Sequence, residues 1–161
     1  MVARGANRGF TLIEMIATVA IMAILVAIAV PSFKDMILGV RVRTAASDLL
    51  QAVMLARSEA IKRAANVEVV PATGGWTQGW TIVTGGTTLE THEAPANVTI
   101  NANTTGNITF RLDGRVSTNV RTLTVYTTES SSTIAARCIM IDASGRPTIR
   151  NDGDGNPANG C

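Results

Sequence analysis

Aromatic residues, cysteine and histidine are all scarce in this chain of 161 residues. Aromatic side chains make up 4% of it, there are two cysteines and one histidine, and lysine does not occur after position 62. Two cysteines and one histidine supply too few ligands for a structural zinc site. The sequence also has no glycine-rich phosphate loop and no paired carboxylates in an acid/base setting, so we expect neither an enzyme nor a cofactor.

An excess of charge of one sign is also nearly absent. The formal net charge is +2, and Arg4 and Arg8 account for it, because the rest of the chain holds 12 basic and 12 acidic residues. From position 66 onward there are six arginines and eight acidic residues. This balance excludes a bulk polyanion-binding surface, so any nucleic-acid site would have to be a local arginine cluster.

The one long hydrophobic run extends from Phe10 to Val30. Its 21 residues would be about 31 Å long as a helix, which matches the roughly 30 Å hydrocarbon core of a bilayer. Arg4 and Arg8 precede the run, and no comparable basic cluster follows it directly. The positive-inside rule therefore predicts a single pass, with a short cytoplasmic N-terminus and the rest of the chain outside.

Glu14 places a carboxylate inside that run. An ionised carboxylate within a bilayer costs about 3 kcal/mol and normally marks a functional contact. We predict that a partner supplies a positive charge to Glu14. Without this residue, the run would be interpreted as an uncleaved signal anchor.

The segment from Arg8 to Pro31 resembles the class III signal peptide of type IV pilins and type II secretion pseudopilins. A short basic leader, residues 1–9, ends at Gly9, the residues FTLIE follow at 10–14, and the apolar run continues from there. The resemblance implies that a prepilin peptidase cuts between Gly9 and Phe10 and methylates the new amine of Phe10. It also implies that Glu14 pairs with that amine on a neighbouring subunit, which neutralises both charges.

Beyond Pro31 the apolar residues recur at steps of three to five. We predict one helix over residues 10–65, transmembrane over 10–31 and amphipathic over 32–65, with local bending or melting at Pro31. The apolar period then shifts toward two, which predicts strands over 67–71, 79–85, 97–102, 107–112, 123–128 and 137–143. The expected fold class is α+β, a pilin-like long N-terminal helix packed on an antiparallel β-sheet head over residues 66–161.

Segments of the rest of the chain resemble the GspH/FimT family of minor pilins and minor pseudopilins. They are LLQAVMLARSEAIKR at 49–63, GWTQGWTIV at 75–83, ITFRLDGRV at 108–116 and CIMIDASGRPTIR at 138–150. The family implies other major and minor pilins as partners, a bacterial inner-membrane anchor with a periplasmic head, and incorporation into an extracellular pilus. The C-terminal cysteine pair is more similar to the type IV pilus members, and a GspH-like minor pseudopilin of a type II secretion system is the alternative.

Cys138 and Cys161 are separated by a polar loop. Because the head is expected outside the cytoplasm, where disulfides persist, we predict a bridge between them. The loop holds Asp152, Asp154 and Asn156 at alternating positions, as at the start of a calcium loop, but no glutamate follows to complete an EF-hand. We therefore expect a solvated loop closed by the disulfide and no metal site.

Two segments, LDGRV at 112–116 and ASGRPTIR at 143–150, share a glycine–arginine pair. The simpler interpretation is two tight turns with solvated arginines. Some FimT-type members bind DNA through a C-terminal Gly-Arg-x-Arg motif; Gly145 and Arg146 match its start, but the next arginine is Arg150. In an extended segment these two arginines share a face, about 13 Å apart, so binding of double-stranded DNA through its phosphates is a second interpretation.

His92, Trp76 and Trp80 are expected to have no functional role. His92 belongs to a polar, turn-like segment, LETHEAP at 89–95, and a lone exposed histidine is more often incidental than catalytic. The two tryptophans are expected to pack in the core or at a sheet edge.

Overall fold

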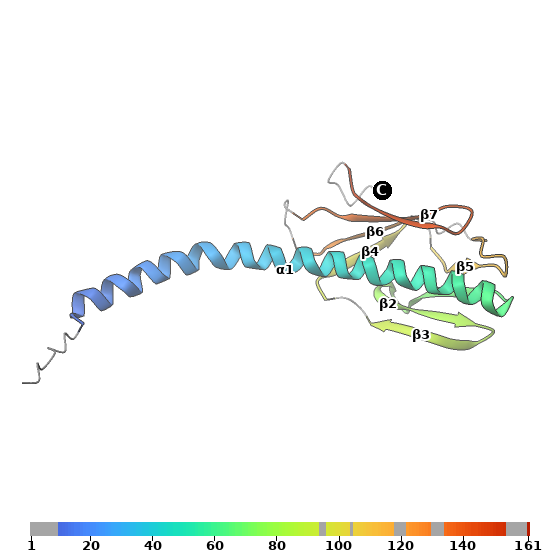
Figure 1. Ribbon diagram of the computed structural model, residues 1–161, viewed down its shortest axis with the longest axis horizontal. Helices are drawn as coiled ribbons and strands as arrows, with labels where there is room; N and C mark the ends of the chain where they lie inside the picture. Colours follow the sequence, from blue (N-terminus) through green and yellow to red (C-terminus); the bar gives the residue numbers. More distant parts are fainter. Residues whose placement is uncertain (1–9, 94–95, 104, 118–121, 130–133, 154–160) are drawn as a thin grey trace, which may run out of the picture. The chain divides into compact units, whose positions relative to one another are not determined.

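The computed structural model describes residues 10–93, 96–103, 105–117, 122–129, 134–153 and 161. In these residues one long helix is followed by eight strands: α1 (Leu12–Arg63), β1 (Val67–Ala72), β2 (Gly75–Thr84), β3 (Thr87–Glu93), β4 (Val98–Ala102), β5 (Ile108–Phe110), β6 (Thr122–Thr127), β7 (Arg137–Ile141) and β8 (Pro147–Asn151) (Figure 1). The chain divides into two compact units, Met1–Met36 and Ile37–Cys161. All eight strands belong to the second unit. From here on, the head means this whole unit, Ile37–Cys161, which adds the second part of the helix to the β-rich region predicted over residues 66–161.

Helix α1 confirms the predicted long helix, and each of its ends lies two residues inside the predicted bounds. At its C-terminus Ala64 has a φ of 51°. The N–H groups of Ala64 and Ala65 donate to the carbonyl oxygens of Ile61 and Ala60 at 3.3 and 3.2 Å. These two bonds form a Schellman motif, in which alanine takes the left-handed position that glycine usually occupies.

Of the local bending or melting expected at Pro31, the melting is wrong. Helix α1 continues without interruption through this residue. Proline removes one backbone donor, but the N–H groups on either side keep their own acceptors within the helix. A single missing hydrogen bond is therefore compatible with the continuous helix.

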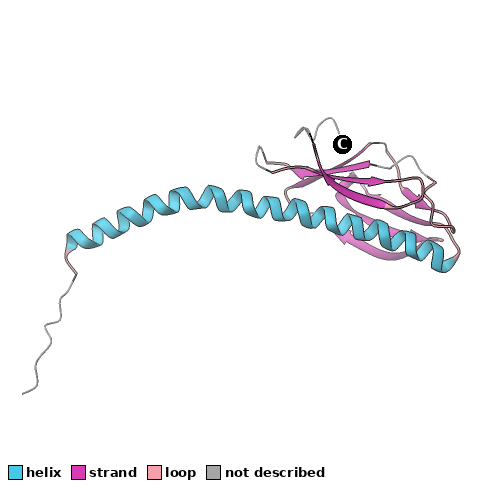
Figure 2. Cartoon of the chain, turned by 45° about the horizontal axis from the view of Figure 1, so that its top comes forward, coloured by secondary structure: helices cyan, strands magenta, loops and turns pink. Residues whose placement is uncertain are grey.

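The head contains two four-stranded sheets, and every pair of neighbouring strands is antiparallel. One sheet has the order β3-β2-β1-β5 and the other β4-β6-β7-β8. Strands of both sheets lie beside the half of α1 that belongs to the head (Figures 1 and 2). The predicted α+β class and antiparallel sheet are confirmed.

The core of the head is formed by one face of α1 and by both sheets. The helix contributes mainly small side chains, which let the sheets approach its backbone closely. Its buried residues are Leu38, Val42, Ala45, Ala46, Leu49, Ala52, Val53, Ala56 and Ala60. The largest fully buried side chains of the sheets are Trp80, Phe110 and Ile82. All these residues lie in Ile37–Cys161, so the head carries its own core.

Trp76 and Trp80 are 5% and 2% exposed, which confirms that they pack in the core. Strands β3 and β8 were not predicted. Each is at the edge of its sheet, and neither has a fully buried residue, so no apolar period of two marks it in the sequence. The predicted strand over 107–112 is also too long, since β5 ends at Phe110 and a turn follows.

Candidate functional site

The first candidate region is the apolar start of α1. Large apolar side chains from Phe10 to Val30 are at least half exposed, and Phe10 itself is 81% exposed. By length and composition the helix can cross a membrane, with a mean hydropathy of 2.6 over its most apolar 18 residues. Gly9, at the expected cleavage site, lies outside the described residues.

Glu14 sits in the first turn of this helix, next to Thr11. Its Oε2 accepts hydrogen bonds from the backbone N–H and the hydroxyl of Thr11 at 3.2 and 3.3 Å. The Thr11 hydroxyl oxygen in turn accepts from the Glu14 N–H at 3.3 Å. This reciprocal arrangement is a capping box. The carboxylate therefore has neutral partners within its own chain, which the sequence interpretation missed, and its Oε1 has no recorded partner among the described residues.

The second candidate region is the pair of glycine–arginine turns, which have the same backbone geometry. In the first, the Gly114 N–H donates to Arg111 O at 2.7 Å, and the Arg111 N–H donates to Arg115 O at 2.9 Å. In the second, Gly145 N–H donates to Asp142 O at 2.9 Å and Asp142 N–H to Arg146 O at 3.2 Å. Both are three-residue loops that end in a left-handed glycine, with φ of 75° and 82°.

These two turns lie against one another and against α1. A Cβ atom on Gly145 would be 2.2 Å from the carbonyl oxygen of Gly114, and a Cβ on Gly114 would be 2.7 Å from Cδ1 of Ile61. The same Gly114 carbonyl accepts a hydrogen bond from Nε of Arg57 at 3.1 Å. Arg57 was not predicted, because its partner is 57 residues away in the sequence and no local pattern indicates the contact.

Several arginines therefore gather around the paired turns. Arg115 and Arg146 follow the two glycines and are exposed, and Arg57 is half-buried beside them. Arg57 and Arg146 line the same groove, together with Met54 and Ile61 of α1 and with Pro147. Among the described residues, no salt bridge is recorded for these three arginines. Their charge is available to an anionic partner.

Asp142 begins the second of these turns, and hydrogen bonds within the turn fix its carboxylate. Its Oδ1 accepts hydrogen bonds from the Ser144 hydroxyl at 2.6 Å and from the Arg146 N–H at 2.9 Å. The hydrogen bond from Ser144 and then that from the Arg146 backbone lower the pKa of Asp142. The carboxylate shapes the turn that presents Arg146.

Arg150 lies near the end of β8, four residues after Arg146. It is opposite Cys138 in the register of β7 and β8, and Thr148 is opposite Met140. Side chains two apart in a strand share a face, so Arg150 and Thr148 lie on the face of the sheet that carries the Cys138 side chain. Arg146 immediately precedes the strand.

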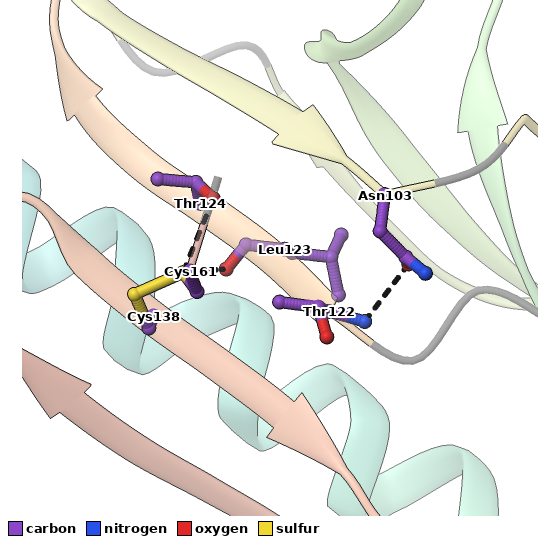
Figure 3. Close-up of a disulfide and its surroundings, with 6 residues drawn as sticks. All are labelled: Asn103, Thr122, Leu123, Thr124, Cys138 and Cys161. Atoms are coloured by element: carbon purple, nitrogen blue, oxygen red, sulfur yellow. Dashed lines mark hydrogen bonds between the residues drawn. A yellow bond between two sulfur atoms is a disulfide. The ribbon is translucent and has the colours of Figure 1, made fainter. Parts of the chain in front are cut away.

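Cys138 and Cys161 form a disulfide with a Cα–Cα distance of 5.7 Å (Figure 3). Cys138 is in β7, and the bridge joins the last residue of the chain to this strand. The Thr124 hydroxyl on the adjacent β6 is 3.2 Å from Sγ of Cys161, and it must be the donor because a disulfide sulfur carries no hydrogen. The bridge thus lies over both strands.

The interpretation of His92 as part of a turn is wrong. His92 belongs to β3, where it is opposite Trp80 of β2, and the two rings stack with centroids 5.1 Å apart. Its Nε2 is 3.1 Å from Oε1 of Glu90, without hydrogen-bond geometry. The period-two signal was hidden because β3 alternates between half-buried and exposed polar residues.

No group of three or more His, Cys, Asp or Glu side chains in the described parts of the chain is arranged to hold a metal ion. Asp152 lies just beyond β8. Asp154 and Asn156, the other residues of the calcium-like pattern, lie outside the described residues.

Comparison with known families gives two matches. Residues 4–30 match the prokaryotic N-terminal methylation motif. Residues 45–145 match the family described as type II transport protein GspH, which covers more than half of the chain. A comparison with curated proteins found no match.

Two crystal structures of the type IV minor pilin FimU from Pseudomonas aeruginosa strain PAO1 share this fold. The first is 18% identical, with a TM-score of 0.60 over 71% of this chain and 95% of FimU. The second, in another crystal form, is 17% identical, with a TM-score of 0.59 over 71% of this chain and 99% of FimU. With its methylation motif, its long apolar helix and a family match over most of the head, the chain belongs to the GspH family of type IV pilin-like proteins.

Proposed function

We propose that this chain is a minor pilin of a type IV pilus, made as a prepilin, cut after Gly9, methylated on the new amine of Phe10 and assembled with other pilins. The observation that carries the proposal is the exposed apolar start of α1 with Glu14 in its first turn. The methylation motif covers the same residues. Exposed apolar side chains over this length need either lipid or other helices around them.

The state of Glu14 supports a contact with a neighbouring subunit. Its Oε2 caps the helix through Thr11, and its Oε1 has no recorded partner in the described structure. Cleavage creates a positive amine on a neighbouring subunit. That amine would form an ion pair with the carboxylate of Glu14 at the membrane face. Helix capping and subunit pairing are then separate roles of one side chain.

Glu14→Gln tests the pairing. The amide keeps an oxygen that can accept from Thr11, and it removes the charge that would attract the amine. We expect membrane insertion to be unchanged and incorporation into filaments to fall strongly, as measured by immunoblotting of sheared filaments and of membranes. Glu14→Ala should behave in the same way. Normal incorporation of Glu14→Gln would disprove the pairing.

The choice between pilus and secretion system rests on the head. Its fold matches FimU, a type IV minor pilin, over nearly all of that protein, whereas the family description names type II transport. We favour the pilus because the C-terminal cysteine pair, which forms a disulfide, is more similar to that of type IV pilus members. Deletion of the gene should abolish or reduce surface pili and leave type II secretion unchanged; the opposite result would assign the chain to the secretion system.

A second function, capture of double-stranded DNA, is favoured by the arginine cluster at the paired turns. Arg57, Arg115 and Arg146 come together from three segments and have no recorded salt bridge in the described structure. Exposed aromatic side chains are absent from the described residues of the head, so bases have no stacking platform there and contacts would be to phosphates. Such binding is independent of sequence and weakens as salt rises.

Electrophoretic mobility shifts of the head, residues 37–161, would test DNA capture. Three phosphate contacts would give a slope of about −2.7 for log affinity against log salt. Arg57→Ala, Arg115→Ala and Arg146→Ala should each weaken binding, and Arg41→Ala, an exposed arginine outside the cluster, should not. Failure of the unmodified head to shift DNA at low salt would exclude this function and would leave pilus assembly unaffected.

A further inference from the structure

A second hollow of the head, distinct from the arginine cluster, lies between α1 and the edge strand β3. It has a volume of about 400 Å³, within the range of roughly 300–1,000 Å³ that is usual for ligand pockets. Its polar lining residues are Arg41, Thr44, Asp48, Trp80, His92 and Glu93, and three small apolar side chains complete it. A hollow of this size accommodates more than one side chain.

Trp80 at this hollow has an unsatisfied donor. The side chain is 2% exposed, and its Nε1 is buried with no hydrogen-bond partner in the described structure. Nε2 of the stacked His92 is also buried without a hydrogen bond. Buried polar atoms are nearly always paired in folded proteins, so the indole N–H of Trp80, a residue that lines the hollow, lacks the acceptor that such a donor usually has.

The other polar groups of the hollow call for both donors and acceptors. Asp48 and Glu93 accept hydrogen bonds, and Arg41 donates them. A lone cation would satisfy the carboxylates and leave the indole N–H unpaired, whereas a lone anion would do the reverse. Peptide groups carry a carbonyl acceptor and an N–H donor together, so they match the whole set.

The edge of strand β3, beside the hollow, also presents hydrogen-bond donors and acceptors, from its backbone N–H and C=O groups. Strand β3 is at the end of the order β3-β2-β1-β5 and pairs only with β2 in the described structure. An unpaired strand edge binds extended peptides by adding them as a further strand. His92 and Glu93, which line the hollow, are residues of this strand.

We propose that this hollow binds a short extended peptide segment of a neighbouring subunit, laid along the free edge of β3. Its carbonyl groups accept from the Trp80 indole and from Arg41, and its N–H groups donate to Asp48 and Glu93. That the peptide comes from a neighbouring subunit rests on the proposed assembly function, but the binding chemistry does not.

NMR titration of the head, residues 37–161, tests the binding. The probe is the neutral blocked tetrapeptide acetyl-Thr-Val-Thr-Val-amide, and the reporters are the two indole N–H resonances. We expect a saturable downfield shift of the Trp80 resonance at about 10 mM peptide or below, with the Trp76 resonance unchanged. The same peptide with methylated backbone nitrogens should produce no such shift.

Isosteric variants locate the contact. Asp48→Asn and Glu93→Gln should each weaken peptide binding about ten-fold, the usual effect of losing one charge-assisted hydrogen bond. Asp113→Asn, in the turn after β5, should bind like the unmodified head. Dispersed indole resonances in every variant would show that each one is folded.

Four outcomes would overturn the proposal. They are no shift of the Trp80 resonance, an equal shift with the methylated peptide, unchanged affinity in both carboxylate variants, and a larger response to acetyl-lysine methylamide or to acetate than to the peptide. Because the test uses an isolated head and a free peptide, it can fail while deletion still abolishes pili, and it can succeed in a protein that forms none.

Discussion

A Cβ atom on Gly145 would lie 2.2 Å from the carbonyl oxygen of Gly114, in another turn of the head. Real Cβ atoms essentially never approach another atom so closely. Gly145 also has a φ of 82°, which side chains of L-residues rarely adopt. The pairing of the two glycine–arginine turns therefore depends on the absence of one side chain.

Gly145→Ala should destabilise the head severely. Gly86 has the same φ of 82° but open space around the Cβ position, so Gly86→Ala isolates the backbone strain, about 1–2 kcal/mol. Gly145→Ala adds the overlap with Gly114 and should cost at least about 3 kcal/mol. Urea unfolding of the head measures both. Equal losses in the two variants would contradict the close contact between the turns.

Ala64→Gly should stabilise the head by about 0.5–1 kcal/mol. Alanine occupies the left-handed position of the Schellman motif that ends α1, and glycine removes that strain at some cost in unfolded-chain entropy. Gln51→Gly, at an exposed position inside the same helix, should instead destabilise by about 1 kcal/mol. Thermal or urea unfolding of both variants distinguishes a specific effect of the cap from a general effect of glycine.

Removal of the disulfide should lower the free energy of unfolding by about 3 kcal/mol, because the bridge spans 23 residues and restricts the unfolded chain. The double variant Cys138→Ala/Cys161→Ala and the reduced unmodified head should lose similar amounts. Unfolding curves with and without reductant, with free thiols counted in parallel, provide the measurement. Two free thiols together with an unchanged melting temperature would show that the bridge contributes nothing.

Asp142 should make the head sensitive to acid. Its hydrogen bonds from Ser144 and the Arg146 backbone lower its pKa in the folded state, and the unfolded value is about 3.9. The stabilisation is therefore present above about pH 4 and is lost as the pH falls through the lower folded pKa. The difference in unfolding free energy between the unmodified head and Asp142→Asn should shrink over that range.

Ser144→Ala provides the matching control for Asp142. It removes the hydrogen bond that contributes most to the lowered pKa, so the pKa of Asp142 measured by NMR titration should move back toward its usual value. The acid-dependent loss of stability should then be smaller and should be complete at a higher pH, because the folded pKa lies closer to the unfolded one. An unchanged titration curve would show that Ser144 does not hold the carboxylate.

Local patterns predicted much of the fold. The apolar run and the steps of three to five that follow it predict α1, and the period-two segments predict six of the eight strands. Strands β3 and β8 were missed because neither has a fully buried residue, so both lack that apolar pattern. The helix also continues through Pro31, since one lost donor does not end a helix whose neighbouring bonds are intact.

Some residues of the candidate sites, like some strands, could be predicted from local sequence patterns, and others could not. The residues of the leader, the carboxylate of Glu14 and the two cysteines are recognisable in the sequence, since each depends on residue type and local spacing. Arg57 is not, because its partner is 57 residues away. The Trp80–His92 stack is not, because the polar sequence of β3 hid the hairpin that brings the two rings together.

By itself, the sequence determined the apolar helix, the α+β class and the two glycine–arginine turns, because side-chain polarity, helical period and glycine's tolerance of positive φ act over a few residues. Only the tertiary structure decided that the two turns pack together beside Arg57 and that a hollow lies between α1 and β3. Those arrangements follow from two sheets packing on one helix face, and contacts between distant segments leave no mark in the local pattern.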